Sequence, residues 1–167
     1  MASGDTLAIF YARSASFPTS AFATPDLRNN HPVLDFDGST DEEAFFEGVL
    51  PANYAGGGVT VDLYVAFSSA TSGSVRLQTD IERQNASGPD LDADSFVGTF
   101  QSGGGSASGT SGITTKVSIA HTNGAQMDSL AAGEPFRLKV RRDADGTSGT
   151  DDIASDMELS RVVIRET

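Results

Sequence analysis

The chain has 167 residues, of which 38% are hydrophobic, and a formal net charge of −12 at pH 7. A chain of this length hides roughly two-thirds of its unfolded surface, so we expect one domain over residues 1–167. The acidic balance argues against nucleic acid as a partner, because phosphate binding needs clustered Lys and Arg, and no apolar run approaches the roughly 20 residues of a membrane span.

Short strands with turn signals between them account for most of the chain. Apolar and polar side chains alternate most clearly over Val59–Phe67, and alternation is the pattern of a half-buried strand. The expected strands, in chain order, are Leu7–Ala12, Val33–Phe36, Ala44–Leu50, Val59–Ser68, Ser74–Gln84, Ser95–Phe100, Ile113–His121, Phe136–Arg142 and Met157–Arg165. The best helical pieces are Ser39–Glu43 and Ala125–Ala132. This pattern predicts an all-β fold, a single-domain antiparallel β-sandwich of the jelly-roll-like type.

Three segments interrupt the strand pattern. Residues 14–32 contain prolines and small polar residues that prevent regular pairing over much of their length, which predicts a surface crossing or an extended arm. Phe17 and Phe22 are the apolar anchors of this segment, and they either fill pockets on a partner or cover the open end of the chain's own sandwich. Residues 102–112 are rich in Gly and Ser, residues 143–152 (DADGTSGTDD) combine small residues with Asp, and both are expected to form flexible loops.

Clustered carboxylates are the residues that most resemble a reaction centre. Residues 35–43 (DFDGSTDEE) could hold a hard cation or divide acid and base roles, but the same residues are typical of turns and caps. Asp90, Asp92 and Asp94 begin a calcium-loop pattern, which then fails because the turn Gly and the bidentate Glu are missing.

No other residue type completes a site. His31 and His121 lack the spacing of metal ligands and are interpreted as turn or surface residues that form hydrogen bonds. No Ser lies in a nucleophile motif, and the Gly-rich runs do not precede a helix as a phosphate loop does. The sequence therefore predicts no catalytic residue, no cofactor and no metal.

Arg137, Lys139 and Arg141 form the concentrated positive feature of the chain. They alternate with apolar residues, so they project from the solvent side of one strand. They are either an external docking patch or partners of acidic residues on a neighbouring strand, such as Asp80 or Glu82.

Several longer motifs cover nearly the whole chain: residues 29–37 (NNHPVLDFD), 41–73 (DEEAFFEGVLPANYAGGGVTVDLYVAFSSATSG), 90–96 (DLDADSF), 130–144 (LAAGEPFRLKVRRDA) and 158–167 (ELSRVVIRET). Together they resemble small β-sandwich proteins encoded among bacteriophage structural genes. The resemblance implies a non-enzymatic jelly-roll subunit of the virion, either a capsid decoration (cement) protein or a head or tail fibre component. These motifs are topological, and they carry no catalytic residue.

The resemblance also implies partners and a location. A decoration protein would bind the major capsid protein on the outer shell as a homotrimer, after synthesis in the host cytoplasm, and the absence of Cys is compatible with that compartment. The first alternative is a fibre or receptor-binding protein that recognises host-surface glycans, although the chain has no Trp and only three Tyr for stacking. The second alternative is a polysaccharide lyase or hydrolase that uses the carboxylates of residues 35–43 or 90–94.

Overall fold

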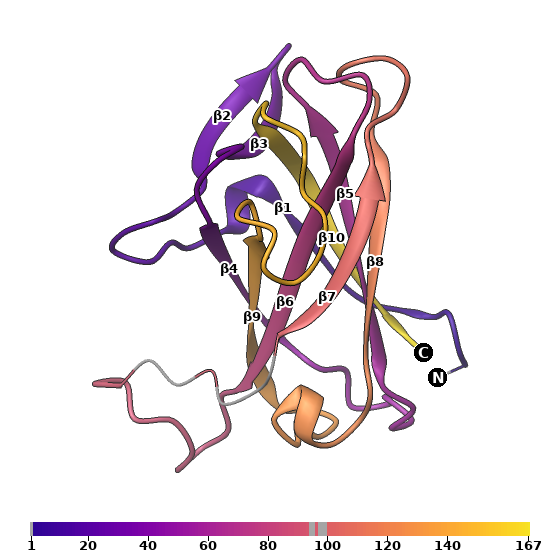
Figure 1. The fold of residues 1–167 in the computed structure, drawn as a ribbon. Coiled ribbons are helices and arrows are strands. Elements are labelled where there is room, and N and C mark those ends of the chain that lie inside the picture. The colour runs from indigo at the N-terminus through magenta and orange to yellow at the C-terminus, as the bar shows by residue number, and fades with distance from the viewer. Residues whose placement is uncertain (1, 94–95, 97–99) are drawn as a thin grey trace.

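The computed structural model describes residues 2–93, 96 and 100–167, which form two antiparallel sheets packed face to face (Figure 1). The strands are β1 (Thr6–Tyr11), β2 (Thr24–Arg28), β3 (His31–Phe36), β4 (Glu42–Val49), β5 (Val59–Phe67), β6 (Ser74–Arg83), β7 (Gln101–Ser106), β8 (Thr115–His121), β9 (Pro135–Arg142) and β10 (Met157–Glu166). Two 3₁₀ turns, η1 (Ala12–Ser14) and η2 (Ala125–Met127), complete the described elements. The predicted all-β sandwich is confirmed.

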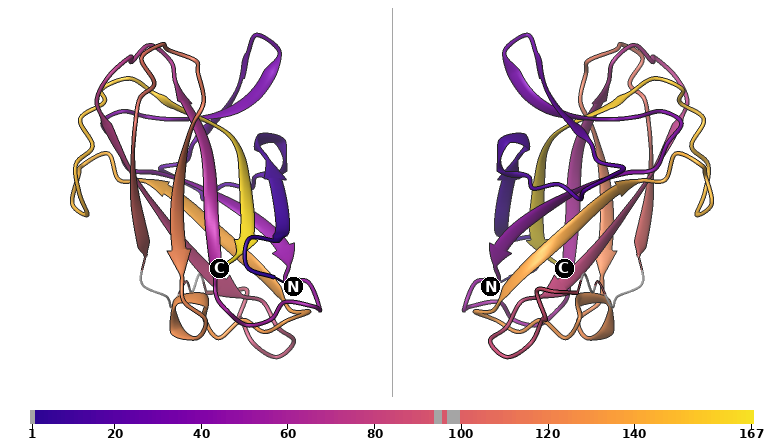
Figure 2. Two further views of the ribbon diagram at one scale, coloured as in Figure 1. Left: turned by 90° about the vertical axis from the view of Figure 1, so that its right-hand side faces the viewer. Right: turned by 90° about the vertical axis from the view of Figure 1, so that its left-hand side faces the viewer.

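The two sheets differ in size and in how they are completed. The larger sheet, called sheet A, has the order β2-β3-β10-β5-β8, and sheet B has the order β4-β9-β6-β7. In sheet A, β5 follows one side of β10, while β3 pairs with Met157–Leu159 and β1 pairs with Arg161–Arg165 on the other side. Figure 2 shows the layers from the two sides, with both chain termini at one end and the β2–β3 hairpin projecting at the other.

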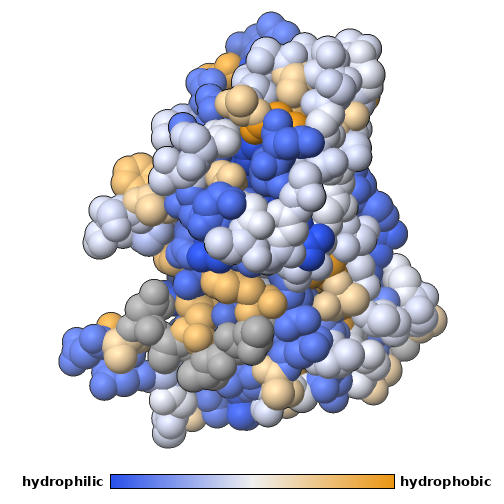
Figure 3. All heavy atoms as spheres, viewed as in Figure 1, coloured by the Kyte–Doolittle hydropathy of each residue, from blue (hydrophilic) through white to orange (hydrophobic). Residues whose placement is uncertain are grey.

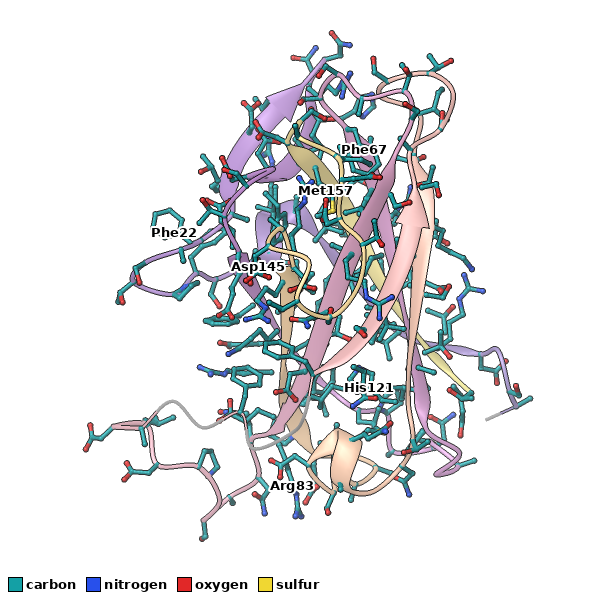
Figure 4. The ribbon with its side chains drawn as sticks, in the orientation of Figure 1. Phe22, Phe67, Arg83, His121, Asp145 and Met157 are labelled. Atoms are coloured by element: carbon teal, nitrogen blue, oxygen red, sulfur yellow. The ribbon has the colours of Figure 1, made fainter. Side chains whose placement is uncertain are left out.

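The core lies between the sheets and is built from the inward residues of the alternating strands. Val59, Val61, Leu63, Val65 and Phe67 of β5 are all buried. Phe67 and Met157, both labelled in Figure 4, belong to this core. A slip of one residue along such a strand would expose this apolar set, so the alternation specifies the register.

The strand β7 contradicts one prediction. Residues 102–112 were expected to be a flexible loop, but Gln101–Ser106 pair in register with Ser74–Thr79 of β6. A Cβ atom on Gly103 would lie 2.8 Å from Ile119 Cγ1, and one on Gly105 would lie 2.5 Å from Val117 Cγ2. The glycines therefore allow β7 to lie directly against β8 of the opposite sheet, and backbone hydrogen bonds hold a strand that has little side chain.

Residues 14–32 are also more regular than their prolines suggested. Thr24–Arg28 pair with β3, and Ser16 exchanges backbone hydrogen bonds of 2.9 Å with Phe45 at the edge of β4. The part of the segment before β2 thus lies along sheet B and covers the edge of β4, and β2 itself forms the edge of sheet A.

The remaining expected elements have mixed outcomes. Residues 39–41 form bends and a connection rather than a helix, and β4 begins at Glu42. Within the expected helix Ala125–Ala132, only η2 is helical. The expected strand Ser95–Phe100 falls largely outside the described residues, although Phe96 and Phe100 are described. Across the described part of the chain, no helix is long and apolar enough to cross a membrane.

Candidate functional site

A groove of about 470 Å³ crosses the outer face of sheet A near the start of β10. The tip of the β2–β3 hairpin and the loop before β8 line its sides, and β10 and the end of β5 contribute the rest of its surface. The polar side chains that line it are Arg28, Asn29, His31, Ser111, Thr114, Glu158, Ser160 and Arg161. Ile113 at the rim is 56% exposed. The groove is thus open, and polar residues outnumber apolar ones in its lining, while about half of its surface is apolar.

One row of side chains continues from this groove across the sheet. The strand register pairs Tyr11 of β1 with Arg161 of β10, and Arg161 with Tyr64 of β5. The guanidinium carbon of Arg161 lies 5.1 Å from the centroid of the Tyr64 ring, which is within cation–π range. Tyr11 is 59% exposed, so its ring offers a flat surface to an incoming molecule. Arg161 belongs to both the groove and the row, and it therefore connects them.

A buried carboxylate beside this row fixes the neighbouring cations. Asp62 forms ion pairs with Arg165 Nη2 at 2.8 Å and with Lys116 Nζ at 3.4 Å, and it accepts a hydrogen bond from Ser118 Oγ at 2.5 Å. Arg165 Nη2 also lies 3.3 Å from the hydroxyl of Tyr64. These contacts hold the ring of Tyr64 in one orientation.

Arg28 fastens the β2–β3 hairpin to the rest of sheet A. Its guanidinium forms an ion pair with Glu158 and donates to the backbone oxygen of Phe67 at 2.8 Å. Gly112, at φ +79°, lies so close that a Cβ there would be 2.9 Å from Arg28 Nη2. A glycine is therefore needed where the loop meets the arginine.

Asp35 stands next to Glu158 in the strand register, outside the lining of the groove. Burial, followed by repulsion from the nearby carboxylates of Asp26, Glu158 and Asp156, raises the pKa of Asp35 to about 6. Among the described residues of 35–43, Asp35 has the pKa that departs most from its ordinary value. Burial is thus the main reason why its charged form is disfavoured, and the neighbouring acids add to it.

The rest of that acidic segment forms a turn. Asp37 Oδ1 accepts hydrogen bonds of 2.7 Å from the backbone and the hydroxyl of Ser39 and of 2.8 Å from the backbone of Thr40. These bonds lower the pKa of Asp37. The backbone N–H of Asp37 donates to Glu42 at 2.8 Å. Around Asp37 the segment thus shows the turn chemistry that its structural interpretation expects.

Asp41 meets a loop that is distant in sequence. One carboxylate oxygen each of Asp41, Asp143 and Asp145 lies within 4.8 Å of the others, and oxygens of this kind suit a hard cation. The carboxylate of buried Asp143 accepts bonds from Thr147 Oγ1 and from the backbone and hydroxyl of Ser148. The loop's own donors thus satisfy Asp143. The second acidic pattern is a turn in which Asp90 Oδ1 accepts from the backbone of Asp92 at 3.0 Å, and Asp94 lies outside the described residues.

The predicted basic residues Arg137, Lys139 and Arg141 do project from the outer face of β9, where they are engaged by other residues of the same chain. Arg137 lies 2.7 Å from Glu82, Lys139 3.6 Å from Glu43 and Arg141 3.7 Å from Asp41. Cross-strand pairing with an acidic neighbour such as Glu82, one of the two alternatives, is therefore present.

Aromatic rings cover the same face of sheet B. Lys139 Nζ lies 4.3 Å from the centroid of Phe96, and the guanidinium carbon of Arg141 lies 4.4 Å from that of Phe100. The rings of Phe45 and Phe96 stack at 5.7 Å. Figure 3, which faces sheet B, shows apolar atoms gathered beside the grey segment. The strip of positive charge is thus interleaved with aromatic side chains.

Phe17 and Phe22, the other predicted contact residues, lie together on the segment that covers β4. Their ring centroids are 6.1 Å apart. Phe17 is half-buried against the hydrophobic core, while Phe22 is 42% exposed and points outward in Figure 4. Phe17 therefore helps to cover the chain's own sandwich, and Phe22 keeps a face open to solvent.

Two buried polar residues were missed or misplaced by the sequence analysis. Arg142 was not singled out, yet it is 0% exposed and binds Asp151 at 2.8 Å. The alternation of β9 could have shown this, since Arg142 occupies the next inward position after Val140.

His121 was expected in a turn or on the surface, but it is buried, and its ring nitrogens bond to Thr79 Oγ1 and to the backbone oxygen of Gln126. Burial lowers the pKa of His121. His31, by contrast, is exposed and lines the groove.

Comparison with known proteins defines the fold further. No protein-family profile matches the chain, and no curated protein matches it. The chain is similar to the CBM22-2 xylan-binding domain of Xyn10C from Paenibacillus barcinonensis, with a TM-score of 0.51 and 12% identity over 92% of each chain. It is also similar to the C-terminal CBM6 of the laminarinase LamC from Zobellia galactanivorans, with a TM-score of 0.49 and 17% identity over 96% of this chain and 99% of that one. At these identities the likeness concerns the fold, a β-sandwich like that of carbohydrate-binding modules.

Proposed function

We propose that this chain, a sandwich folded like a carbohydrate-binding module, binds glycans without catalysing a reaction on them. The proposed site, called the sheet A site, consists of the groove together with Tyr11, Arg161 and Tyr64. The observation that carries the proposal is the continuous path from an open polar groove to an exposed tyrosine ring.

The chemistry of this path suits a sugar chain. A pyranose presents hydroxyl groups at its edge and an apolar C–H surface on its face, so it is recognised by hydrogen-bonding side chains beside an aromatic ring. Arg161, Ser160 and His31 supply polar groups along the groove, and Tyr11 supplies the ring. An open groove on a sheet face also admits a chain that continues beyond both ends of the site.

The fold supports the proposal at a general level. The structure with a TM-score of 0.51 is a xylan-binding domain, and a shared fold by itself does not show that the ligand is shared. A fold neighbour with a glycan ligand shows that such a sandwich can present a glycan site. For this chain, glycan binding is supported by the residues of the sheet A site.

Binding without catalysis is favoured by the state of the carboxylates. Glycoside hydrolysis uses two carboxyl groups with separate acid and base roles. Glu158, which lines the groove, is paired with Arg28, and Asp37 is held in a turn. Asp35 lies beside Glu158 but outside the groove lining, so the described groove residues do not offer such a pair.

The virion assignment stays a prediction from the sequence resemblance. Decoration of a capsid as a homotrimer, with the major capsid protein as partner, finds no specific support in the sheet A site. The fibre or receptor-binding alternative is the form of that prediction with which the site agrees, because host-surface glycans would then be the ligand.

Isothermal titration calorimetry against a panel of soluble neutral and acidic polysaccharides tests the proposal. We expect Tyr11→Ala to weaken binding several-fold, a loss on the order of 1 kcal/mol for one aromatic contact. Phe22→Ala is the matched control, because it removes another exposed ring from the segment along sheet B. Absence of binding to every glycan, or equal losses in the two variants, would contradict a sheet A site.

A further inference from the structure

We propose that the glycan bound at the sheet A site carries carboxylate groups, as uronic acid residues do, and that Arg161 binds them. This inference rests on the proposed function and specifies its ligand class. It starts from a cation that has no acidic partner among the residues that the structure describes.

Most cations of this chain are paired within the molecule. The chain has 11 Lys and Arg residues. Those with a carboxylate partner are Arg28, Arg83, Lys116, Arg137, Lys139, Arg141, Arg142 and Arg165. In the part of the chain that the structure describes, Arg13, Arg76 and Arg161 form no ion pair, and Arg76 donates to Ser102 and Ser148 instead. An unpaired arginine is therefore uncommon here, and Arg161 is the one that lines the groove.

The surroundings of Arg161 hold it ready for a ligand. It is exposed, and its guanidinium lies over the ring of Tyr64, which is itself fixed by Arg165. A stacked guanidinium keeps its N–H groups at the edge of the plane, where they can meet a carboxylate in two parallel hydrogen bonds. Tyr11, one strand away, would stack on the sugar ring that bears this carboxylate.

The local charge agrees with an anionic ligand although the whole chain is acidic. Beside Arg161, the face of β5, β8 and β10 carries Arg165 and Lys116, which share the buried Asp62, and the groove adds the paired Arg28 and Glu158. Cations thus outnumber carboxylates there, in a chain of net charge −12.

The acidic pair Asp26 and Asp35 also lies on sheet A, toward the β2–β3 hairpin, and neither lines the groove. Repulsion from more distant acids is screened beyond about 8 Å at physiological ionic strength. A direct contact between the carboxylate of the ligand and Arg161 is screened much less. The positive charges around Arg161 therefore favour an anionic ligand at this site over a neutral one.

The test compares one sugar backbone with and without its charge. Calorimetry at a fixed ionic strength of about 0.15 M would measure binding of oligogalacturonate and of its methyl ester to the full chain. Dextran sulfate, an anionic glycan with another backbone, tests for nonspecific ion exchange. We expect the free acid to bind at least tenfold more tightly than the ester. Arg161→Gln should reduce acid binding to the level of the ester, and Arg161→Lys should retain part of the preference. Arg83→Gln removes one positive charge near η2, where Figure 4 places Arg83, and it should leave binding unchanged.

Three other results would contradict the inference or the proposed function. Equal binding of acid and ester, unaffected by Arg161→Gln, would overturn this inference and leave glycan binding intact. Dextran sulfate binding that falls equally in the Arg161→Gln and Arg83→Gln variants, with no preference for the uronate, would indicate nonspecific ion exchange and would also overturn it. Failure of all three ligands and of the neutral panel to bind would reject the proposed function itself.

Discussion

Arg142 is the residue whose removal we expect to cost the fold most. Its side chain is 0% exposed and donates to both carboxylate oxygens of Asp151, at 2.8 and 3.0 Å. It also donates to the backbone oxygens of Ser155 at 2.9 Å and Phe36 at 3.3 Å, and to that of Ile153. The guanidinium therefore ties the end of β3 to the segment that leads into β10. Both strands contribute to the sheet A site.

The change Arg142→Met keeps an unbranched apolar stem and removes every one of these donors. Asp151, whose side chain is 1% exposed, is then left as a buried charge without its cation. Removing one partner of a buried ion pair costs about 3–5 kcal/mol. That is a large share of the roughly 5–15 kcal/mol by which domains are stable.

Urea denaturation followed by circular dichroism measures this loss as a lower midpoint at unchanged slope. Lys116→Met is the matched control, since it breaks a 3.4 Å pair whose lysine is 44% exposed, and we expect a loss of at most about 1 kcal/mol. If Arg142→Met cost no more than this control, the assignment of a stabilising role to the buried pair would be refuted.

Three further predictions concern packing and pH. Gly105→Val should destabilise the chain by about 1–3 kcal/mol in the same assay, because its Cβ would meet Val117, whereas Gly104→Ala faces only ordinary contacts and should be nearly neutral. The pKa of Asp35 is raised from 3.8 to about 6, so the folded state binds the proton more tightly and stability falls as the pH rises from about 4 to 6. Asp35→Asn should reduce this dependence of the unfolding free energy on pH, measured by denaturation at each pH. An unchanged dependence would contradict the prediction. The pKa of His121 is lowered from 6.5, so stability should fall as the pH drops below 6.5, and His121→Gln should remove that component.

Side-chain alternation was enough to predict the sandwich and most of its strands. Inward and outward residues follow one another in β5 and β9 as the sequence indicates, because each sheet packs one face on the core. A strand with few side chains, such as β7, shows no such alternation and could not be predicted in this way. The run that forms β7 contains Gly103, Gly104 and Gly105, and its pairing depends on how closely β8 approaches, which is a tertiary fact.

The candidate site was harder to predict than the fold. Tyr11, Arg161 and Tyr64 are far apart in the chain and become neighbours only through the order of β1, β10 and β5. Strand order is not encoded in local periodicity. The basic residues around Lys139 were more conspicuous in the sequence, yet their charges are taken up by neighbouring acids and rings.

The central claim is that the outer face of sheet A binds glycan, and chemical-shift mapping tests it most directly. A ¹⁵N-labelled sample would be titrated with oligogalacturonate and with xylo-oligosaccharide while backbone amide shifts are recorded. The account predicts shifts that saturate and that cluster at Tyr11, Tyr64, Arg161 and the loop before β8. Shifts confined to sheet B around Phe45 and Lys139, or no saturable shifts with either sugar, would contradict it.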